Sequence, residues 1–113
     1  MGSKRTLDYA TLVVDGDMSS NITSDSTNIL HMDRVGYQLS WTGTPTGDFY
    51  VDVSNDGTTW IEQTLSTAVA AAGSADDAFI DAETAAKYIR FRYVASSGSG
   101  TLQAYVTGKS ISG

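Results

Sequence analysis

Residues 34–60 constrain the fold more than any other stretch, because apolar and polar side chains alternate strictly along two of its segments. A period of two predicts strands that have one buried face and one face in water. The apolar positions are Val35, Tyr37, Leu39 and Trp41 in the first segment, and Phe49, Val51 and Val53 in the second.

Turn-forming residues follow each of these two segments. Thr42–Gly47 contains two glycines and the only proline of the chain, and Asn55-Asp56-Gly57 comes directly after the second segment. Gly57 can adopt the positive φ that such a turn needs, so we expect a positive φ there. The pattern predicts a β-hairpin over 34–54, followed by a second hairpin whose next strand begins at Trp60.

The last third of the chain repeats this pattern. Alternating runs at 88–93 and 102–107 flank a Ser- and Gly-rich connector, which predicts another hairpin. Residues 68–75 are mostly alanine, but they are too few for an isolated helix and lack an amphipathic stripe, so we expect a loop. Further short strands are expected at 6–14, 29–32, 61–65 and 78–81, and Asp81 is expected to cap a single helical turn over 82–86.

These elements predict an all-β, single-domain antiparallel β-sandwich of about eight strands, of jelly-roll or immunoglobulin-like type. The chain has 113 residues, eleven of them glycine, which suits short strands and tight turns. We divide it into an N-terminal strand and polar extended arm over 1–28 and a sandwich over 29–113. The predicted core is Val35, Tyr37, Leu39, Trp41, Phe49, Val51, Val53, Trp60, Ile89, Phe91, Leu102 and Val106.

Charge and composition weigh against several classes of partner. The net charge is −6, and seven basic residues are scattered among thirteen acidic ones, whereas phosphate binding needs clustered Lys and Arg. No apolar run approaches the ~20 residues of a membrane span, and the N-terminus lacks the apolar core of a signal peptide. We therefore expect neither a nucleic-acid partner nor a membrane partner.

The residues that could carry chemistry are few and do not form a recognisable constellation. The chain has no Cys and one histidine, His31, which excludes thiolate nucleophiles and the usual zinc sites. Asp15-Gly16-Asp17 resembles the start of a calcium loop, but serines stand where that loop needs its Gly and its Glu. Glu62 and Glu83 are the only glutamates. We expect no catalytic residue, no metal, no cofactor and no enzymatic activity.

Outward-facing aromatic and basic residues are the candidate interface. Tyrosine and arginine are enriched at protein interfaces, whereas a merely solvated face usually carries Lys and Glu. The candidate interface residues are Lys4, Arg5, Tyr50, Tyr88, Arg90, Arg92 and Tyr105.

The order of several short strings resembles that of small structural proteins encoded in the virion-gene clusters of tailed bacteriophages. The strings are Thr-Gly-Thr-Pro-Thr-Gly-Asp-Phe (42–49), Val-Ser-Asn-Asp-Gly (53–57), Tyr-Ile-Arg (88–90) and Ser-Gly-Ser-Gly-Thr-Leu (97–102), and the resemblance covers about residues 30–108. It implies a non-enzymatic virion part, such as a capsid decoration, head-fibre or tail component, that is assembled in the host cytoplasm. The implied partners are copies of itself and a major capsid or other virion protein.

A second resemblance is to discoidin-like carbohydrate-binding jelly rolls. It rests on Val-Ser-Asn-Asp-Gly-Thr-Thr-Trp (53–60) and Lys-Tyr-Ile-Arg-Phe-Arg (87–92). This resemblance implies a glycan partner, and it leaves a carbohydrate-binding module or a tail-associated adhesion component as the alternative functions.

Overall fold

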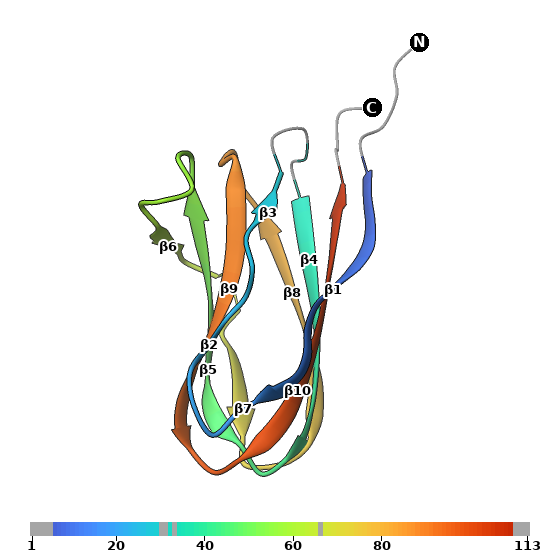
Figure 1. The fold of residues 1–113 in the computed structure, drawn as a ribbon, viewed down its shortest axis with the longest axis vertical. Coiled ribbons are helices and arrows are strands. Elements are labelled where there is room, and N and C mark those ends of the chain that lie inside the picture. Colours follow the sequence, from blue (N-terminus) through green and yellow to red (C-terminus); the bar gives the residue numbers. More distant parts are fainter. Residues whose placement is uncertain (1–5, 30–31, 33, 66, 110–113) are drawn as a thin grey trace.

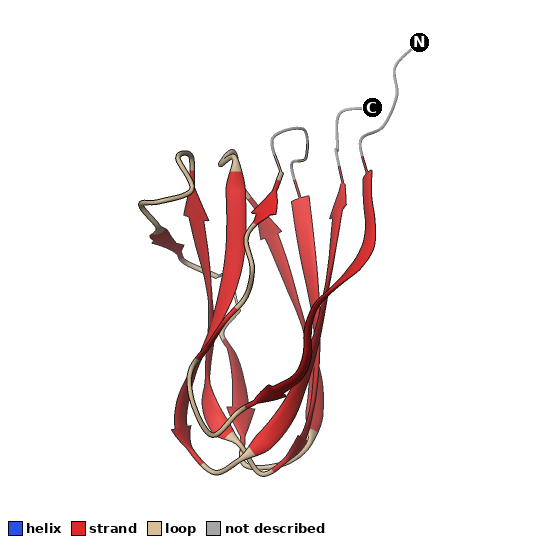
Figure 2. Ribbon diagram, in the orientation of Figure 1, coloured by secondary structure: helices blue, strands red, loops and turns tan. Residues whose placement is uncertain are grey.

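Two antiparallel sheets packed face to face form the protein, as a computed structural model of residues 6–29, 32, 34–65 and 67–109 shows (Figure 1). The first sheet has the order β1 (Thr6–Asp17), β10 (Gly100–Lys109), β4 (Arg34–Gly43) and β8 (Asp76–Glu83). The second has the order β2 (Ile22–Thr23), β9 (Tyr88–Ser97), β5 (Thr46–Ser54) and β6 (Ile61–Gln63), with β3 (Thr27–Asn28) also beside β9 and β7 (Val69–Ala72) also beside β5. The described residues contain no helix (Figure 2), and the expected all-β sandwich is confirmed.

The order of the strands identifies the topology as a jelly roll. In the first sheet no strand pairs with its neighbour in the sequence, since β10 lies between β1 and β4. Going from β4 to β5, and from β8 through β9 to β10, the chain changes sheet at every step. An immunoglobulin-like domain would instead pair consecutive strands within one sheet. Of the two predicted topologies, the jelly roll with its two Greek keys is the one observed.

The predicted hairpin over 34–54 is wrong, because β4 and β5 lie in different sheets. The predicted hairpin over 88–107 is wrong for the same reason, since β9 belongs to the second sheet and β10 to the first. Alternation shows which face of a strand is buried. It does not show which strand lies beside it, because two strands facing each other across a core have the same period as two paired strands.

The connection from β4 to β5 and the connection from β9 to β10 each cross between the sheets. They lie against each other at one end of the sandwich, the lower end in Figure 1. The Thr44 N–H donates a hydrogen bond to the Ser99 carbonyl oxygen at 2.8 Å. Gly98 has a φ of 75°, and a Cβ at this position would overlap the Thr44 carbonyl oxygen. The backbones of the two corners therefore approach too closely for any side chain at Gly98.

The second predicted hairpin is present, because β5 and β6 pair antiparallel across the turn that follows β5. Gly57 has a φ of 76°, which confirms the expected positive value. In this turn the backbone N–H groups of Thr59 and Thr58 donate hydrogen bonds to Asp56 Oδ1 at 2.8 and 2.9 Å. These hydrogen bonds lower the pKa of Asp56 to about 2, because they stabilise the charged carboxylate.

Three other expectations differ from the structure. Residues 69–72 form strand β7 beside β5 and not a loop, because their small side chains fit against the sheet. Ala82 and Glu83 end strand β8, so no helical turn follows Asp81. Ile29 and Met32 lie outside any strand, and the rest of the strand expected at 29–32 lies outside the described residues.

The expected polar arm over 15–28 is part of the sandwich. β1 extends to Asp17, Met18 is fully buried, and β2 and β3 pair with β9. Ser24 Oγ accepts a hydrogen bond from the Phe91 N–H at 3.0 Å, and the Ser24 hydroxyl donates to the Asp25 carbonyl oxygen at 3.0 Å. The described residues before position 29 thus contribute strands to both sheets.

The core lies between the two sheets and is built around an aromatic cluster. Phe49 is central to it, with its ring centroid 5.4 Å from that of Trp41 and 4.9 Å from that of Tyr93. Of the predicted core residues, those that are buried are Val35, Tyr37, Leu39, Trp41, Phe49, Val51, Ile89, Phe91, Leu102 and Val106. Val53 is only partly buried, and Trp60 does not belong to the core. Buried apolar residues that the prediction omitted are Met18, Ile29, Ala71, Ile80, Ala82, Tyr93 and Ala104.

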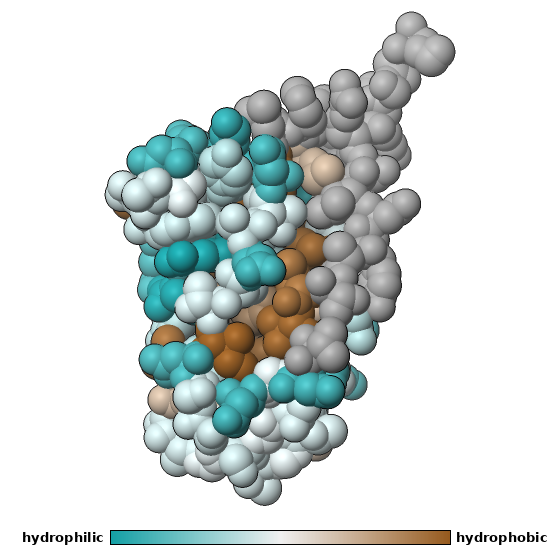
Figure 3. Space-filling view, in the orientation of Figure 1, coloured by the Kyte–Doolittle hydropathy of each residue, from teal (hydrophilic) through white to brown (hydrophobic). Residues whose placement is uncertain are grey.

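Partly buried apolar residues extend the core toward the surface. Leu12, Val13 and Ile22 pack against the buried cluster from β1 and β2. In the view of Figure 3, an apolar area lies in the middle of the face, with hydrophilic and neutral residues above it, below it and to its left.

Candidate functional site

The outer face of the second sheet carries a cluster of paired charges, built on β5 and β9. Arg90 and Arg92 point outward because the alternate residues of β9 are buried. In the antiparallel register Asp52 lies directly opposite Arg90, and Tyr50 lies opposite Arg92. This register brings two of the candidate interface residues, Tyr50 and Arg92, into contact across the strands.

Asp52 is the centre of this cluster. Arg90 Nε and Arg92 Nε both donate hydrogen bonds to Asp52 Oδ2, at 3.1 and 2.7 Å, and Arg92 Nη2 donates to Glu62 Oε1 at 2.8 Å. The Asp52 side chain is only 5% exposed although it points away from the core, because the two arginines cover it. Hydrogen bonding to Asp52, and further to Glu62, raises the pKa of Arg92.

Both arginines of this cluster, and the nearby Lys87, also lie over an aromatic ring. The Arg90 guanidinium is 4.3 Å from the Trp60 ring centroid, and the Arg92 guanidinium is 5.0 Å from that of Tyr50. Lys87 Nζ lies 5.2 Å from the Tyr88 ring. Trp60 was predicted in the core; its ring is instead half-buried on the outside, where Arg90 covers it.

We call Tyr50, Asp52, Trp60, Glu62, Arg90 and Arg92 the arginine ladder. The candidate residue Tyr88 lies on the same face of β9, whereas Tyr105 lies on the outer face of the first sheet, between the buried residues of β10. Lys4 and Arg5 lie outside the described residues. The sequence analysis did not place Asp52, Glu62 and Trp60 on this surface, because their roles depend on the register of β5 with β6 and β9.

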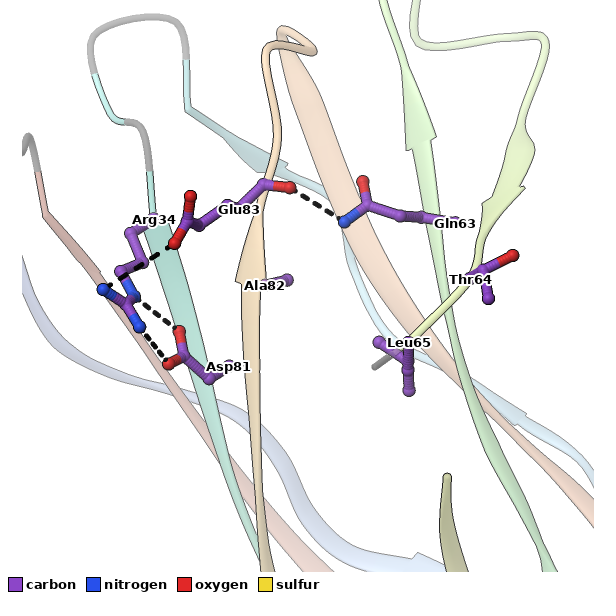
Figure 4. Close-up of a pocket in the computed structure, with 7 residues that line it drawn as sticks. All are labelled: Arg34, Gln63, Thr64, Leu65, Asp81, Ala82 and Glu83. Carbon is purple, nitrogen blue, oxygen red and sulfur yellow. Dashed lines mark hydrogen bonds and ion pairs between the residues drawn. The ribbon is translucent and has the colours of Figure 1, made fainter. Parts of the chain in front are cut away.

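A pocket opens on the side of the sandwich where the edge strands β8 and β6 face each other (Figure 4). Arg34 donates two hydrogen bonds to Asp81, from Nε to Oδ1 at 2.9 Å and from Nη2 to Oδ2 at 2.6 Å. Its Nη1 lies 3.8 Å from Glu83 Oε1. Gln63 Nε2 donates to the Glu83 backbone carbonyl at 2.9 Å and so links the two sheets.

The charged groups of this pocket are one arginine and the two carboxylates that it holds. The hydrogen bonds from Arg34 to Asp81 raise the pKa of Arg34, so the guanidinium stays charged and holds both carboxylates. The remaining lining residues are Thr64, Leu65 and Ala82, which offer one hydroxyl and two apolar side chains. A carboxylate held by a bidentate arginine is a weak proton acceptor, which does not suit general base catalysis.

The described part of the chain shows neither a metal-binding cluster nor a membrane-spanning helix. No group of three or more His, Cys, Asp or Glu side chains there could hold a metal ion, and His31 lies outside it. In the suspected calcium loop, Asp17 Oδ1 accepts hydrogen bonds from the hydroxyl and backbone N–H of Ser19, which lower the pKa of Asp17. Asp15 Oδ1 accepts from Gln103 Nε2 of β10 at 2.6 Å, so residues 15–17 form the end of strand β1 with both carboxylates hydrogen-bonded to protein groups. Within the same residues, no helix has the length and apolarity to cross a membrane.

Comparison with known proteins shows likeness of fold. No family model matches the chain, and no curated protein matches it. A chain of infectious bursal disease virus, Gx strain, matches 98% of this chain with a TM-score of 0.67 and 15% identity. The PBSX exported protein XepA matches 95% with a TM-score of 0.62 and 17% identity, and the SPBc2 prophage-derived protein YomS matches 95% with a TM-score of 0.54 and 10% identity.

The matched proteins differ in how much of their own length is involved. This chain spans 37% of the XepA chain and 33% of the viral chain, so each of those proteins contains more than this fold. For YomS the match spans 96% of that chain. At these identities the comparisons establish a common sandwich fold.

Proposed function

We propose that this chain is a non-enzymatic structural protein of a bacteriophage virion. It acts as a capsid decoration protein through contacts with copies of itself and with a major capsid or other virion protein. The observation that carries this proposal is the arginine ladder, an ordered surface of arginines and aromatic rings on the outer face of the second sheet. The shared fold adds support, since one matched structure is of a VP2 subviral particle and another is of a prophage-derived protein.

The arginine ladder has the composition of a protein-binding surface. Trp, Tyr and Arg are the residue types that most often dominate the energy of protein interfaces. The two arginines are already fixed by Asp52 and Glu62, so binding a partner freezes few side-chain rotamers. The charges of Arg90, Arg92, Asp52 and Glu62 also cancel, which lowers the cost of removing this surface from water.

The polar groups of the two described sites support a structural role. Asp52, Asp81 and Glu83 each form an ion pair with an arginine, and these ion pairs link neighbouring strands. The proposal therefore assigns no catalytic residue and no cofactor. It assigns the virion as the location, with assembly in the host cytoplasm.

The direct test is whether the chain is a component of phage particles. We expect mass spectrometry to find it in density-gradient-purified particles of the phage that encodes it. The purified protein should also bind to particles of a mutant phage that lacks the gene for this chain. A chain that is absent from the wild-type particles contradicts the proposal.

Variants of the arginine ladder test which surface binds. Tyr50→Ser and Trp60→Ser remove the rings without leaving a charge unpaired, so we expect folded protein with at least about tenfold weaker particle binding. Thr42→Ser, at an exposed position near the end of β4, is the matched control and should bind as the parent does. Equal binding by all three variants would place the contact elsewhere on the molecule.

The alternative readings give different results in the same system. A carbohydrate-binding module should bind a glycan array as isolated protein, and the Trp60→Ser variant should lose that binding. A tail-associated adhesion component should be found on the tail by immunogold labelling, whereas a decoration protein should label the head.

A further inference from the structure

The ring of Phe79 lies open on the outer face of the first sheet. Phe79 is 59% exposed, while Ile80 and Ala82 on the same strand are buried, so the ring points away from the core. A Cβ at Gly36 would overlap the Phe79 ring, which shows that the ring lies across the bare backbone of β4. One face of the ring is thus covered by the sheet, and a large part of the other is accessible.

Carboxylates surround this ring. Asp77 and Asp81 share the outer face of β8 with Phe79, each about 7 Å away along the strand. Arg34 pairs with Asp81 and approaches Glu83. No described basic side chain pairs with Asp77 or with the adjacent Asp76. Strand β8 therefore carries four carboxylates against one neighbouring guanidinium, and the area around Phe79 is net negative.

The other sheet shows what such an arrangement accepts. In the arginine ladder, Arg92 lies over the Tyr50 ring and donates to a carboxylate on the neighbouring position. Phe79 offers the same combination of aromatic ring and nearby carboxylate. Within the described residues, no cation of this chain lies over the Phe79 ring. Phe79 and its carboxylates thus match the ring and carboxylate that bind Arg92 in the arginine ladder, but they have no cation of their own among the described residues.

From this geometry we infer that Phe79 and Asp77 form a docking site for an arginine or lysine side chain of a partner protein. The inference rests on the proposed function, since it names the chemistry of the partner surface in the assembly. The guanidinium or ammonium group lies over the open face of the ring and donates to Asp77. A partner surface bearing such a basic residue is complementary in charge to this face.

The same charges select against other ligands. The carboxylates on β8 repel phosphate groups, which disfavours nucleic acids and anionic lipid headgroups. A neutral sugar could stack on the ring but would gain nothing from the negative field. A cationic side chain gains from both the ring and the carboxylates, so it is the occupant that this surface favours.

Titration of the full chain with a short peptide tests this site directly. The probe is acetyl-Gly-Arg-Gly-amide, followed by ¹H–¹⁵N correlation spectra of the labelled protein. We expect saturable shifts confined to Phe79, Asp77 and their cross-strand neighbours Gln38 and Ser40. Phe79→Leu and Asp77→Asn should each weaken binding about threefold, as expected for the loss of one exposed cation–π or ionic contact.

Two controls make the result decisive. The same peptide with citrulline in place of arginine keeps the shape but lacks the charge, and it should cause no saturable shift. Ile61→Ala removes another large exposed apolar side chain, which lies on β6, and should leave the affinity unchanged. The inference is overturned if the citrulline peptide binds equally well, if Phe79→Leu binds as the parent does, or if glucose shifts the same resonances with higher affinity.

Failure of this inference can be told apart from failure of the proposed function. A chain that binds particles but does not bind the peptide at Phe79 contradicts the docking site alone. A chain that binds the peptide but is never found in particles contradicts the virion role alone.

Discussion

Tyr37 is fully buried in the core, and its hydroxyl has no hydrogen-bond partner among the described residues. Its ring packs edge-on against Phe91, with the centroids 5.3 Å apart. The ring fills volume that the core needs, whereas the unpaired hydroxyl has lost its hydration without compensation. Among the described residues, the Tyr93 hydroxyl is buried without a hydrogen-bond partner in the same way.

Tyr37→Phe should therefore be tolerated or stabilising. The substitution removes the desolvated hydroxyl and keeps the ring, so the free energy of unfolding should stay equal or rise by about 1 kcal/mol. Urea denaturation measures this, with Tyr50→Phe on the surface as the control that should change nothing. A loss of more than about 1 kcal/mol would mean that the hydroxyl is satisfied in the folded protein.

The same hydroxyl gives the protein a sensitivity to alkali. Burial raises the pKa of Tyr37 well above its ordinary value of 10.0, because the charged phenolate is poorly solvated in the core. The folded state then holds this proton more tightly than the unfolded state does. The contribution of Tyr37 to stability should be constant below pH 10 and fall as the pH rises above it. We expect Tyr37→Phe to flatten this part of the stability profile, and an unchanged slope would contradict the assignment.

The two tryptophans should differ sharply in their contribution to stability. Trp41 is 3% exposed, packs on Phe49 and donates from Nε1 to the Ser74 carbonyl oxygen at 3.0 Å. Trp41→Ala should cost about 3–5 kcal/mol, because it leaves a cavity in the core. Trp60→Ala removes a half-buried ring and one cation–π contact, and should cost about 1–2 kcal/mol. Equal losses in urea melts would show that Trp60 packs more deeply than the structure shows.

At the scale of strands and turns, two glycines with nearly equal backbone angles offer a matched pair. Gly57 and Gly98 have φ values of 76° and 75°. A Cβ at Gly57 would meet only the Tyr88 ring at 3.4 Å, whereas one at Gly98 would overlap the Thr44 carbonyl oxygen. Gly57→Ala should cost about 1 kcal/mol from the left-handed conformation alone. Gly98→Ala should cost at least about twice as much, since the corner must also move, and the reverse order in thermal melts would contradict this account of the corner.

The strands themselves were easier to predict from the sequence than the way in which they pair. The strands at 34–43 and 46–54 were predictable because their apolar faces alternate. The strands that they pair with were not predictable. Two strands joined by a crossover between sheets show the same apolar alternation as two strands of a hairpin. The burial of Asp52 was also beyond prediction, because it is covered by arginines that only the β5–β9 register brings together. Gly57 was predictable because the requirement of its turn is local.

At the scale of the whole molecule, most pairings join residues far apart in the chain. β1 pairs with β10, so in the sheet the first described strand is hydrogen-bonded to the last. Such topologies fold slowly, because loops must close before any contact forms.

We therefore expect single-exponential refolding on a timescale of about milliseconds to seconds in stopped-flow fluorescence. The Trp41→Phe variant serves as the control for which tryptophan reports the signal. Refolding within microseconds would contradict the expected cost of closing these long loops.

The position of β10 has a consequence for synthesis on the ribosome. The strand made last enters the middle of the first sheet, with β1 on one side and β4 on the other. Until it emerges, one edge of β4 is unpaired and β1 has no partner strand, so a gap one strand wide stays open beside β4. Such a gap can accept a foreign strand, so translation passes through a stage at which a neighbouring nascent chain could donate its own β10 and leave two molecules intertwined.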